Sequence, residues 1–288
     1  MSSEDTHPTA QTVIAVDGLH FPECLRWHDG LLYFSDMYGD RVHSFDPDTG
    51  EVGTISEVFH PAGIGWLPDG RMLVVASEDR LILEIGESRN RVYADLADVV
   101  PGWLNDMLVD RSGRIYVGNF GYDLFSEEPR PTHLAMVDPD GAVALQPDEV
   151  LFPNGMVMRS DGTLVVAETF ANCLTTFSVQ DDGSLRRKTS LPLGECIPDG
   201  ICIDAEDHVW ISSVYDKQAV RVSPDGERER YRVGQMAFAC VLGGRDRQTL
   251  FIATAPDFEP GDRRACKQGR IETLKVDVPG VGDQGLGV

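Results

Sequence analysis

Four oxygen-bearing side chains recur at one position of a repeating pattern in this sequence. They are Glu23, Asn105, Asn154 and Asp199. Two carboxylates and two carboxamides that converge on one point would repel each other and would be costly to desolvate. A divalent cation resolves that conflict. All-oxygen ligation suits calcium or magnesium, and the larger, more flexible calcium shell better fits donors drawn from four separate segments.

A simpler explanation is that Asn and Asp favour the turns that precede strands. Turn preference accounts for one or two of the four residues. It accounts poorly for Glu23 in the same register, and for the absence of Lys, Ser or His from the set. The corresponding positions of two further segments hold Ala62 and Ala239. We therefore expect a ring of six positions, four of which supply oxygen ligands.

The elements that position these residues are short, β-rich runs, each preceded by a turn. The runs span residues 31–36, 71–77, 114–120, 163–169, 208–214 and 249–255. Val, Ile, Tyr, Phe and Thr dominate them, as strands prefer, and most of the turns are Asp-Gly or similar hairpin signals. Their starting residues are 40, 43, 49, 45 and 41 positions apart, the size of a four-stranded propeller blade. This spacing predicts an all-β, six-bladed β-propeller with four antiparallel strands per blade.

The last repeat runs out after its third strand, residues 270–276, whereas residues 12–19 form a strand without partners of its own. We expect the N-terminal strand to complete the last blade and close the ring, which hides two aggregation-prone edges. No helical periodicity is present. The prediction is a flexible tail (1–11), one propeller domain (12–278) and a C-terminal tail (279–288).

Four segments resemble the SMP-30/gluconolactonase/LRE family, which includes regucalcin and bacterial lactonases. The segments are PECLRW with LLYFSD (22–27 and 31–36), WLNDMLVD (103–110), PNGMVM (153–158) and PDGICID (198–204). The resemblance covers residues 13–278. It implies a six-bladed propeller that binds calcium or another divalent ion (magnesium, manganese or zinc) and hydrolyses lactones. It also implies Glu23, Asn154 and Asp199 as metal ligands, Asn105 as a contact to metal or substrate, and Asp199 as general base or nucleophile.

The sequence departs from the family pattern at Trp103. Sugar-lactone hydrolases of the family carry an Arg two residues before the asparagine, where it holds polar or acidic substrate groups. An indole offers an apolar face and a single donor, so we expect an apolar or aromatic-tolerant pocket. Gluconolactone is then a poor candidate for the natural substrate.

Two long loops, residues 121–132 and 256–269, are expected to overhang the site, and at least one is expected to act as a lid. Within them Tyr122, Phe125, Phe258 and Arg263 are candidates for shaping specificity. Glu168 ends its strand on the same face, near Asn154. It is a candidate substrate contact, either as a second acid/base or as a support for the ligands; a solvated strand-end glutamate is the alternative.

The net charge of −22 disfavours nucleic acid and anionic membrane surfaces as partners. No apolar run reaches the roughly 20 residues of a membrane span, and the N-terminus lacks the plan of a signal peptide. A cytoplasmic location is expected, with the six cysteines as buried thiols. No G-x-S-x-G elbow, P-loop or dinucleotide fingerprint is present, which argues against serine hydrolase, NTPase and nicotinamide chemistry.

The function predicted is metal-assisted hydrolysis of a small-molecule lactone. The ion would polarise the carbonyl, Asp199 would take a proton from water, Asn105 would donate to the substrate, and Trp103, Glu168 and Tyr122 would contact it. One alternative is a phosphotriesterase or arylesterase with the same site. Others are a metal-stabilised binding propeller without turnover and the chemistry of strictosidine synthase-like proteins, against which the four oxygen ligands weigh.

Overall fold

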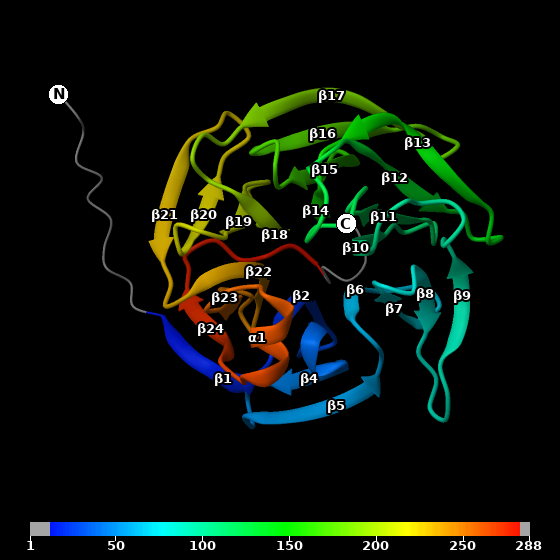
Figure 1. Cartoon of the computed structure of the whole chain (residues 1–288). Helices are drawn as coiled ribbons and strands as arrows, with labels where there is room; N and C mark the ends of the chain where they lie inside the picture. Colours follow the sequence, from blue (N-terminus) through cyan, green and yellow to red (C-terminus); the bar gives the residue numbers. More distant parts are fainter. Residues whose placement is uncertain (1–11, 283–288) are drawn as a thin grey trace.

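The computed structural model describes residues 12–282, which form six four-stranded antiparallel sheets around a central channel (Figure 1). The prediction of an all-β, six-bladed propeller is confirmed. The predicted tail of residues 1–11 and the last six residues of the predicted C-terminal tail lie outside the described residues. Nearer the propeller, Ala205 donates to the carbonyl of Pro279, and Gly280 donates to that of Arg247, so residues 279–280 pack against the fifth and sixth blades.

Each of the first five blades consists of four consecutive strands, ordered from the channel outwards. Blade 1 contains β2 (Pro22–His28), β3 (Leu31–Asp36), β4 (Arg41–Asp46) and β5 (Glu51–Glu57). Blade 2 contains β6 (Pro61–Trp66), β7 (Met72–Ala76), β8 (Leu81–Glu84) and β9 (Arg91–Asp95). Blade 3 contains β10 (Leu104–Val109), β11 (Ile115–Asn119), β12 (Thr132–Val137) and β13 (Val143–Val150). Blade 4 contains β14 (Pro153–Met158), β15 (Thr163–Glu168), β16 (Cys173–Val179) and β17 (Leu185–Pro192). Blade 5 contains β18 (Pro198–Ile203), β19 (Val209–Ser213), β20 (Gln218–Val222) and β21 (Arg228–Arg232).

The sixth blade joins the two ends of the chain. It contains β22 (Met236–Gly243), β23 (Thr249–Ala255), β24 (Gly269–Lys275) and, outermost, β1 (Val13–Leu19). β1 pairs antiparallel with β24, with Val13 opposite Thr273 and Leu19 opposite Gly269. The N-terminal strand therefore closes the ring, as predicted, and covers an edge that would otherwise present unpaired backbone groups.

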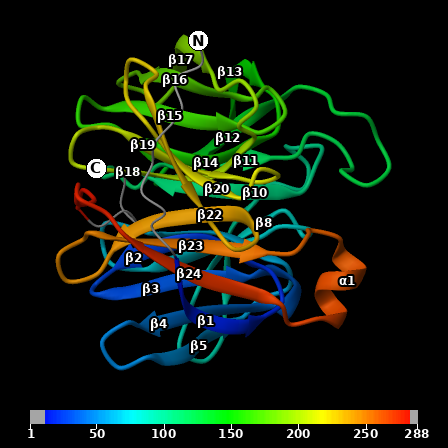
Figure 2. The same cartoon turned by 90° about the vertical axis from the view of Figure 1, so that its left-hand side faces the viewer.

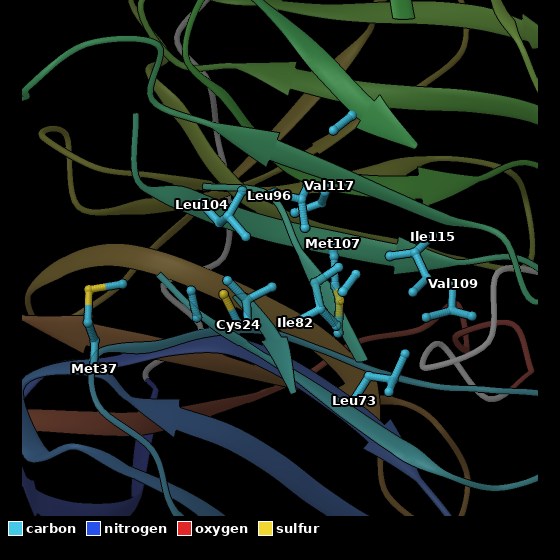
Figure 3. Close-up of a cluster of buried hydrophobic side chains, with 14 of the residues drawn as sticks. Cys24, Met37, Leu73, Ile82, Leu96, Leu104, Met107, Val109, Ile115 and Val117 are labelled. Carbon is cyan, nitrogen blue, oxygen red and sulfur yellow. The ribbon is translucent and has the colours of Figure 1, made fainter. Parts of the chain in front are cut away.

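The second strand of each blade is buried on both faces because neighbouring blades stack against it. This explains why every residue of β15 (TLVVAE) and β19 (VWISS) is buried, and why apolar side chains are frequent in these strands. Each Val, Leu or Ile side chain buried in this way contributes about 1.5–3 kcal/mol relative to exposure. Figure 3 shows one such cluster, in which Leu73 and Ile82 of blade 2 pack with Leu104 and Met107 of blade 3.

The innermost strand of each blade carries a β-bulge just after its first residues. In blades 4 and 5 the register against the next strand shifts between Pro153 and Met156 and between Pro198 and Ile201. Glycine in the bulge lets adjacent innermost strands approach closely. A Cβ on Gly200 would lie 2.6 Å from the Cα of Ala239. The bulge therefore helps to bring the side chains at the start of these strands together at one end of the channel.

Two short helices lie in loops between the second and third strands. A 3₁₀ turn, η1 (Met37–Gly39), follows β3, and α1 (Pro260–Ala265) lies in the long loop after β23. Neither was foreseen, because segments of three and six residues are too short to show helical periodicity. Figure 2 shows α1 projecting from one face of the propeller. Among the described residues, no helix has the length and apolar character needed to cross a membrane.

Candidate active site

A cavity lies at the end of the channel where the innermost strands begin. It encloses about 720 Å³ of empty space, part of it open to solvent. Its lining comes from the first residues of the innermost strands and from the loops between second and third strands. Residues from blades 1, 3, 4, 5 and 6 therefore meet in one chamber, where they form a floor, walls and a rim.

The floor of the cavity contains the four predicted oxygen donors. Glu23, Asn105, Asn154 and Asp199 all line it, from β2, β10, β14 and β18, and each is 6–8% exposed. The alanines at the equivalent positions of blades 2 and 6 are completely or almost completely buried. The repeat register thus brings the four donors together, as the sequence pattern predicts. Their roles as ligands and catalytic groups stay predictions.

Hydrogen bonds hold the floor side chains in place. Asn105 donates its Nδ2 to the carbonyl of Pro153 (3.1 Å), and Asn154 donates its Nδ2 to Oγ1 of Thr169 (3.3 Å). The amide groups of both asparagines are thus oriented by the protein, which leaves their carbonyl oxygens available as ligands. One oxygen of Asp199, Oδ1, is buried and has no hydrogen-bond partner among the described residues.

The two carboxyl groups of the floor have raised pKa values. Burial raises the pKa of the Glu23 carboxyl well above its usual range, and the nearby charge of Asp199 adds to the rise. Burial also raises the pKa of Asp199, with Asp106 as the next cause, whereas a hydrogen bond from Asn154 lowers it. Burial thus disfavours the ionised form of both carboxyls, and the Oδ1 of Asp199 has no hydrogen-bond donor among the described residues. A positive charge placed between them would stabilise their ionised forms.

The donor set fits a hard divalent ion. Within residues 12–282 no three His, Cys, Asp or Glu side chains are placed to form a metal cluster of those types. The floor instead combines two carboxylates with two carboxamides, which is the oxygen chemistry that calcium and magnesium accept. An ion there would lie at the base of an otherwise apolar chamber.

The walls of the cavity are apolar, and they too follow the repeat. The residues two positions before the floor residues of blades 1, 3, 4 and 5 line the cavity: Phe21, Trp103, Phe152 and Ile197. Phe152 stacks on Phe120, with ring centroids 4.6 Å apart. Its backbone has φ of +53°, a conformation that is rare for an aromatic residue and marks local strain of the kind found at functional sites.

The rim carries aromatic side chains from loops of five blades. Tyr38, Phe125, Phe170, Tyr215 and Phe258 line the cavity there. Phe125, Phe170 and Tyr215 are 37–51% exposed and surround its mouth. No Arg, Lys or His is among the described residues that line this chamber, and its only charged side chains are Glu23 and Asp199. Charge in this cavity is therefore confined to its floor, and its walls and rim are largely apolar.

Glu168 is not among the residues that line the cavity. It is buried, so the expectation of a solvated strand-end glutamate is wrong. Its carboxylate accepts hydrogen bonds from the backbone of Leu151 (2.6 Å) and the hydroxyl of Thr175, and it pairs with Arg187 at 3.2 Å. These contacts join strands within blade 4. The contact with substrate proposed for Glu168 finds no support in this geometry.

Tyr122 lies beside the cavity, in a smaller recess of about 170 Å³ that it shares with Trp103 and Phe125. The side chain is 2% exposed, and its hydroxyl has no hydrogen-bond partner among the described residues. Burial raises the pKa of Tyr122 to about 12, so it remains a neutral donor. A contact between Tyr122 and substrate would require the substrate to enter this recess.

Of the other loop residues singled out from the sequence, two line the cavity and one does not. Phe125 and Phe258 contribute to it. Arg263 is instead 3% exposed at its side chain and forms an ion pair with Asp257 at 2.8 Å. The pair fixes the loop that carries Phe258, so Arg263 acts on the cavity only through that loop.

Most of the wall was missed from the sequence. Phe21, Phe152 and Ile197 stand at the same register position as Trp103, two residues before a floor residue, and this signal is present in the sequence. Phe120 and Phe238 carry no comparable signal, because their orientation depends on how the strand ends are twisted. The repeat alignment could therefore have predicted all four of these wall residues, but only Trp103 was predicted.

The chain is similar in sequence and in structure to known proteins. The sequence matches the family profile described as SMP-30/Gluconolactonase/LRE-like region over residues 21–256. It is 26% identical to pentonolactonase XacC of Haloferax volcanii, over 80% of this chain and 79% of that protein. It is 25% identical to regucalcin of Xenopus laevis, over 90% and 89% of the two chains. The solved structure of regucalcin from Agrobacterium tumefaciens, described as a calcium-binding protein, superposes with a TM-score of 0.79 at 19% identity and covers 98% of both chains.

Proposed function

This chain belongs to the SMP-30/gluconolactonase/LRE family, and on that premise we propose that it opens the ring of uncharged lactones that bear apolar or aromatic substituents. The observation that carries the proposal is the contrast between the two ends of the cavity. Four oxygen donors form its floor, whereas aromatic and aliphatic side chains form its walls and rim. A cyclic ester with an apolar substituent complements both parts.

Glu23, Asn105, Asn154 and Asp199 would hold one divalent ion, calcium in the first instance, with magnesium, manganese or zinc as alternatives. When bound, the ion supplies Lewis acidity that polarises an ester carbonyl and stabilises the oxyanion. The Oδ1 of Asp199, which is buried without a hydrogen-bond partner among the described residues, and the raised pKa of both carboxyls support this assignment. The description of a relative as calcium-binding supports calcium.

The chain's own groups would then move the protons. Asp199 takes a proton from a water molecule as the water oxygen adds to the lactone carbonyl carbon. The bond between that carbon and the ring oxygen breaks, and the ring oxygen receives the proton from Asp199, which gives an open hydroxy acid. Asn105 uses only one of its two amide hydrogens on Pro153, so the other can donate to the substrate carbonyl or ring oxygen.

The walls decide the class of lactone. Burying a sugar hydroxyl without a hydrogen-bond partner costs about 1–3 kcal/mol, and most of the wall side chains have no group that could be such a partner. An anionic lactone would find no Arg, Lys or His side chain among the described residues of the wall and rim to pair with its charge. Aromatic substituents can instead pack against Trp103 and Phe152, with gains beyond simple burial.

The test is a pH-indicator hydrolysis assay over matched lactones in the presence of calcium. The panel contains phenyl-substituted and alkyl-substituted γ-lactones, gluconolactone, and a lactone that carries a carboxylate. We expect the substituted γ-lactones to have the highest kcat/KM, and Asp199→Asn to abolish their turnover in a folded protein. Preference for gluconolactone would contradict the substrate class, and retained activity in Asp199→Asn would exclude it as the base.

The aromatic rim also suits aryl esters and aryl phosphotriesters, the second candidate class. The same floor could act on either bond. Including phenyl acetate and an aryl phosphotriester in the panel separates the two classes by their kcat/KM. A folded, metal-loaded protein without turnover on any of these substrates would favour a binding propeller.

A further inference from the structure

A buried ion pair lies beside the floor of the cavity but does not line it. Arg26 of β2 donates to Asp106 of β10 at 2.5 Å, and their side chains are 9% and 3% exposed. Arg26 also donates to the carbonyls of Leu25 (3.0 Å) and Met107 (2.8 Å). The pair joins blade 1 to blade 3 across β6 of blade 2, which packs against both strands.

The position of Asp106 is unusual within the repeat. It directly follows a floor residue, Asn105, where the other blades hold glycine or cysteine. In blade 2 this residue is Gly63, whose added Cβ would lie 2.6 Å from the backbone nitrogen of Met107. Burying a charge at such a crowded position is costly unless it is paired, and Arg26 is its partner.

The charge of Asp106 acts on the floor of the cavity. Asp106 repels the carboxylates of both Glu23 and Asp199, and Arg26 attracts that of Glu23. Arg26 lies three residues after Glu23 on the same strand, and Asp106 is adjacent to Asn105. The electrostatic environment of an ion at the floor therefore includes this pair as well as the four donors.

We propose that Arg26 and Asp106 together set the net charge of the floor and thereby match it to a divalent rather than a trivalent cation. The proposal rests on the metal site proposed above. When Glu23 and Asp199 are ionised around a bound cation, three carboxylates (Glu23, Asp106 and Asp199) and one guanidinium (Arg26) leave a net charge of −2. Arg26 is a positioning residue in this account: it contacts neither the ion nor the substrate, and it acts by neutralising Asp106.

The competing explanation is that the pair only holds two blades together. Both explanations predict that breaking it lowers stability, since either single substitution leaves a buried charge without its partner. They differ in ion discrimination. Removing the positive charge should favour a trivalent ion over calcium, because the added attraction grows with the charge of the ion. A purely structural pair would leave the ratio of the two affinities unchanged.

The experiment compares calcium with terbium(III), a trivalent ion of similar size that also prefers oxygen ligands. Dissociation constants are measured by calorimetry for calcium and by luminescence and competition for terbium. The proteins are the wild type, Arg26→Met, Asp106→Asn and the double variant. We expect the Kd ratio of calcium to terbium to rise about tenfold or more in Arg26→Met, in which the floor carries −3. Asp106→Asn, which leaves −1, should weaken calcium binding about tenfold or more.

The double variant is the control, because it restores a net charge of −2 with neither partner present. Its ratio should return to within about threefold of the wild-type value. If Arg26→Met does not fold, the calcium affinities of Asp106→Asn and the double variant are compared instead. The double variant should bind calcium more tightly than Asp106→Asn, because its floor regains a net charge of −2. An unchanged ratio in Arg26→Met, or calcium binding by the double variant that is no tighter than by Asp106→Asn, overturns the proposal while leaving the metal site intact. A folded wild type that binds neither ion overturns the metal site, and this inference with it.

Discussion

At the scale of single residues, the proposed chemistry depends on four floor donors and the wall side chains two positions before them. Among the wall residues, Trp103 is expected to affect substrate preference most. It precedes Asn105 by two residues and lines both the main cavity and the smaller recess. Its indole supplies apolar surface where a guanidinium would supply charge and donors. We therefore expect an indole at this position to favour apolar lactones and a guanidinium to favour polar or acidic ones.

Replacing Trp103 with Arg should reverse part of the substrate preference. We expect kcat/KM for a phenyl-substituted γ-lactone to fall about tenfold or more, because aromatic packing is lost and a charge enters an apolar wall. Activity on a lactone that carries a carboxylate should rise. Trp103→Phe is the matched control and should retain most of the activity on the phenyl-substituted lactone. Equal losses on both lactones in Trp103→Arg would mean that the residue is structural.

Residue-level prediction from the sequence succeeded where the repeat sets the direction of the side chain. Glu23, Asn105, Asn154 and Asp199 share one register, and the structure brings them to one floor. Glu168 and Arg263 lack such a constraint. Their positions are set by Arg187, nineteen residues later, and by Asp257 in an irregular loop. Pairings of this kind depend on tertiary packing and leave no periodic signal.

At the scale of elements, the bulge in each innermost strand positions the floor. Glycine at this point permits close packing of adjacent innermost strands, and Gly200 directly follows Asp199. The hairpin turns and strand spacing made the blades predictable. The bulges were not foreseen, because they arise from packing of neighbouring blades rather than from local preference.

Replacing Gly200 with Ala should disturb both stability and the floor. The added Cβ would lie 2.6 Å from the Cα of Ala239, so the strands must separate. We expect the free energy of unfolding to fall by about 1–3 kcal/mol, measured in urea, and calcium affinity to weaken because Asp199 shifts. Gly261→Ala is the control, since a Cβ there meets nothing within 4 Å. Wild-type calcium affinity in Gly200→Ala would show that the strand position does not matter for the site.

The loop that carries α1 is held over the cavity by Arg264. This residue pairs with Asp40 at 3.1 Å, hydrogen-bonds to His60, and lies 5.7 Å from the ring centroids of both Tyr38 and Phe59. Phe258, in the same loop, lines the cavity. The arrangement suits a lid that is attached to blades 1 and 2.

Arg264→Met should loosen this loop without changing the floor. We expect KM for the preferred lactone to rise about threefold or more with kcat nearly unchanged, because uniform substrate binding is lost. Hydrogen exchange should increase in residues 256–269. Arg245→Met, which removes an exposed pair with Asp48, is the control. Unchanged KM and unchanged exchange would show that Arg264 does not restrain the loop.

At the scale of the whole molecule, stability depends on closure of the ring by β1. Val16 of this strand is 7% exposed and packs in a cluster with Phe251 and Ile271 of blade 6, whereas Val13 is 66% exposed. The sequence predicted this closure because an unpaired strand at one end matched a missing strand at the other. Global topology was therefore easier to predict than the details of the cavity wall.

Val16→Asp should release β1 from the sixth blade. Burying a carboxylate there is costly, so we expect a loss of about 2–4 kcal/mol in the free energy of unfolding, or increased aggregation through the exposed edge of β24. Val13→Asp, on the same strand but exposed, should change stability by less than about 0.5 kcal/mol. Urea unfolding and light scattering measure the two effects. Equal stability of the two variants would contradict ring closure as a major source of stability.

We propose that the four floor donors hold an ion that the lactone-opening reaction requires. The most direct measurement is turnover of a phenyl-substituted γ-lactone by protein treated with chelator, before and after the addition of calcium, with circular dichroism to verify the fold. We predict that chelation lowers kcat/KM by about a hundredfold or more and that calcium restores it in the wild type but not in Glu23→Gln. Full turnover in the chelated, folded protein would contradict the claim.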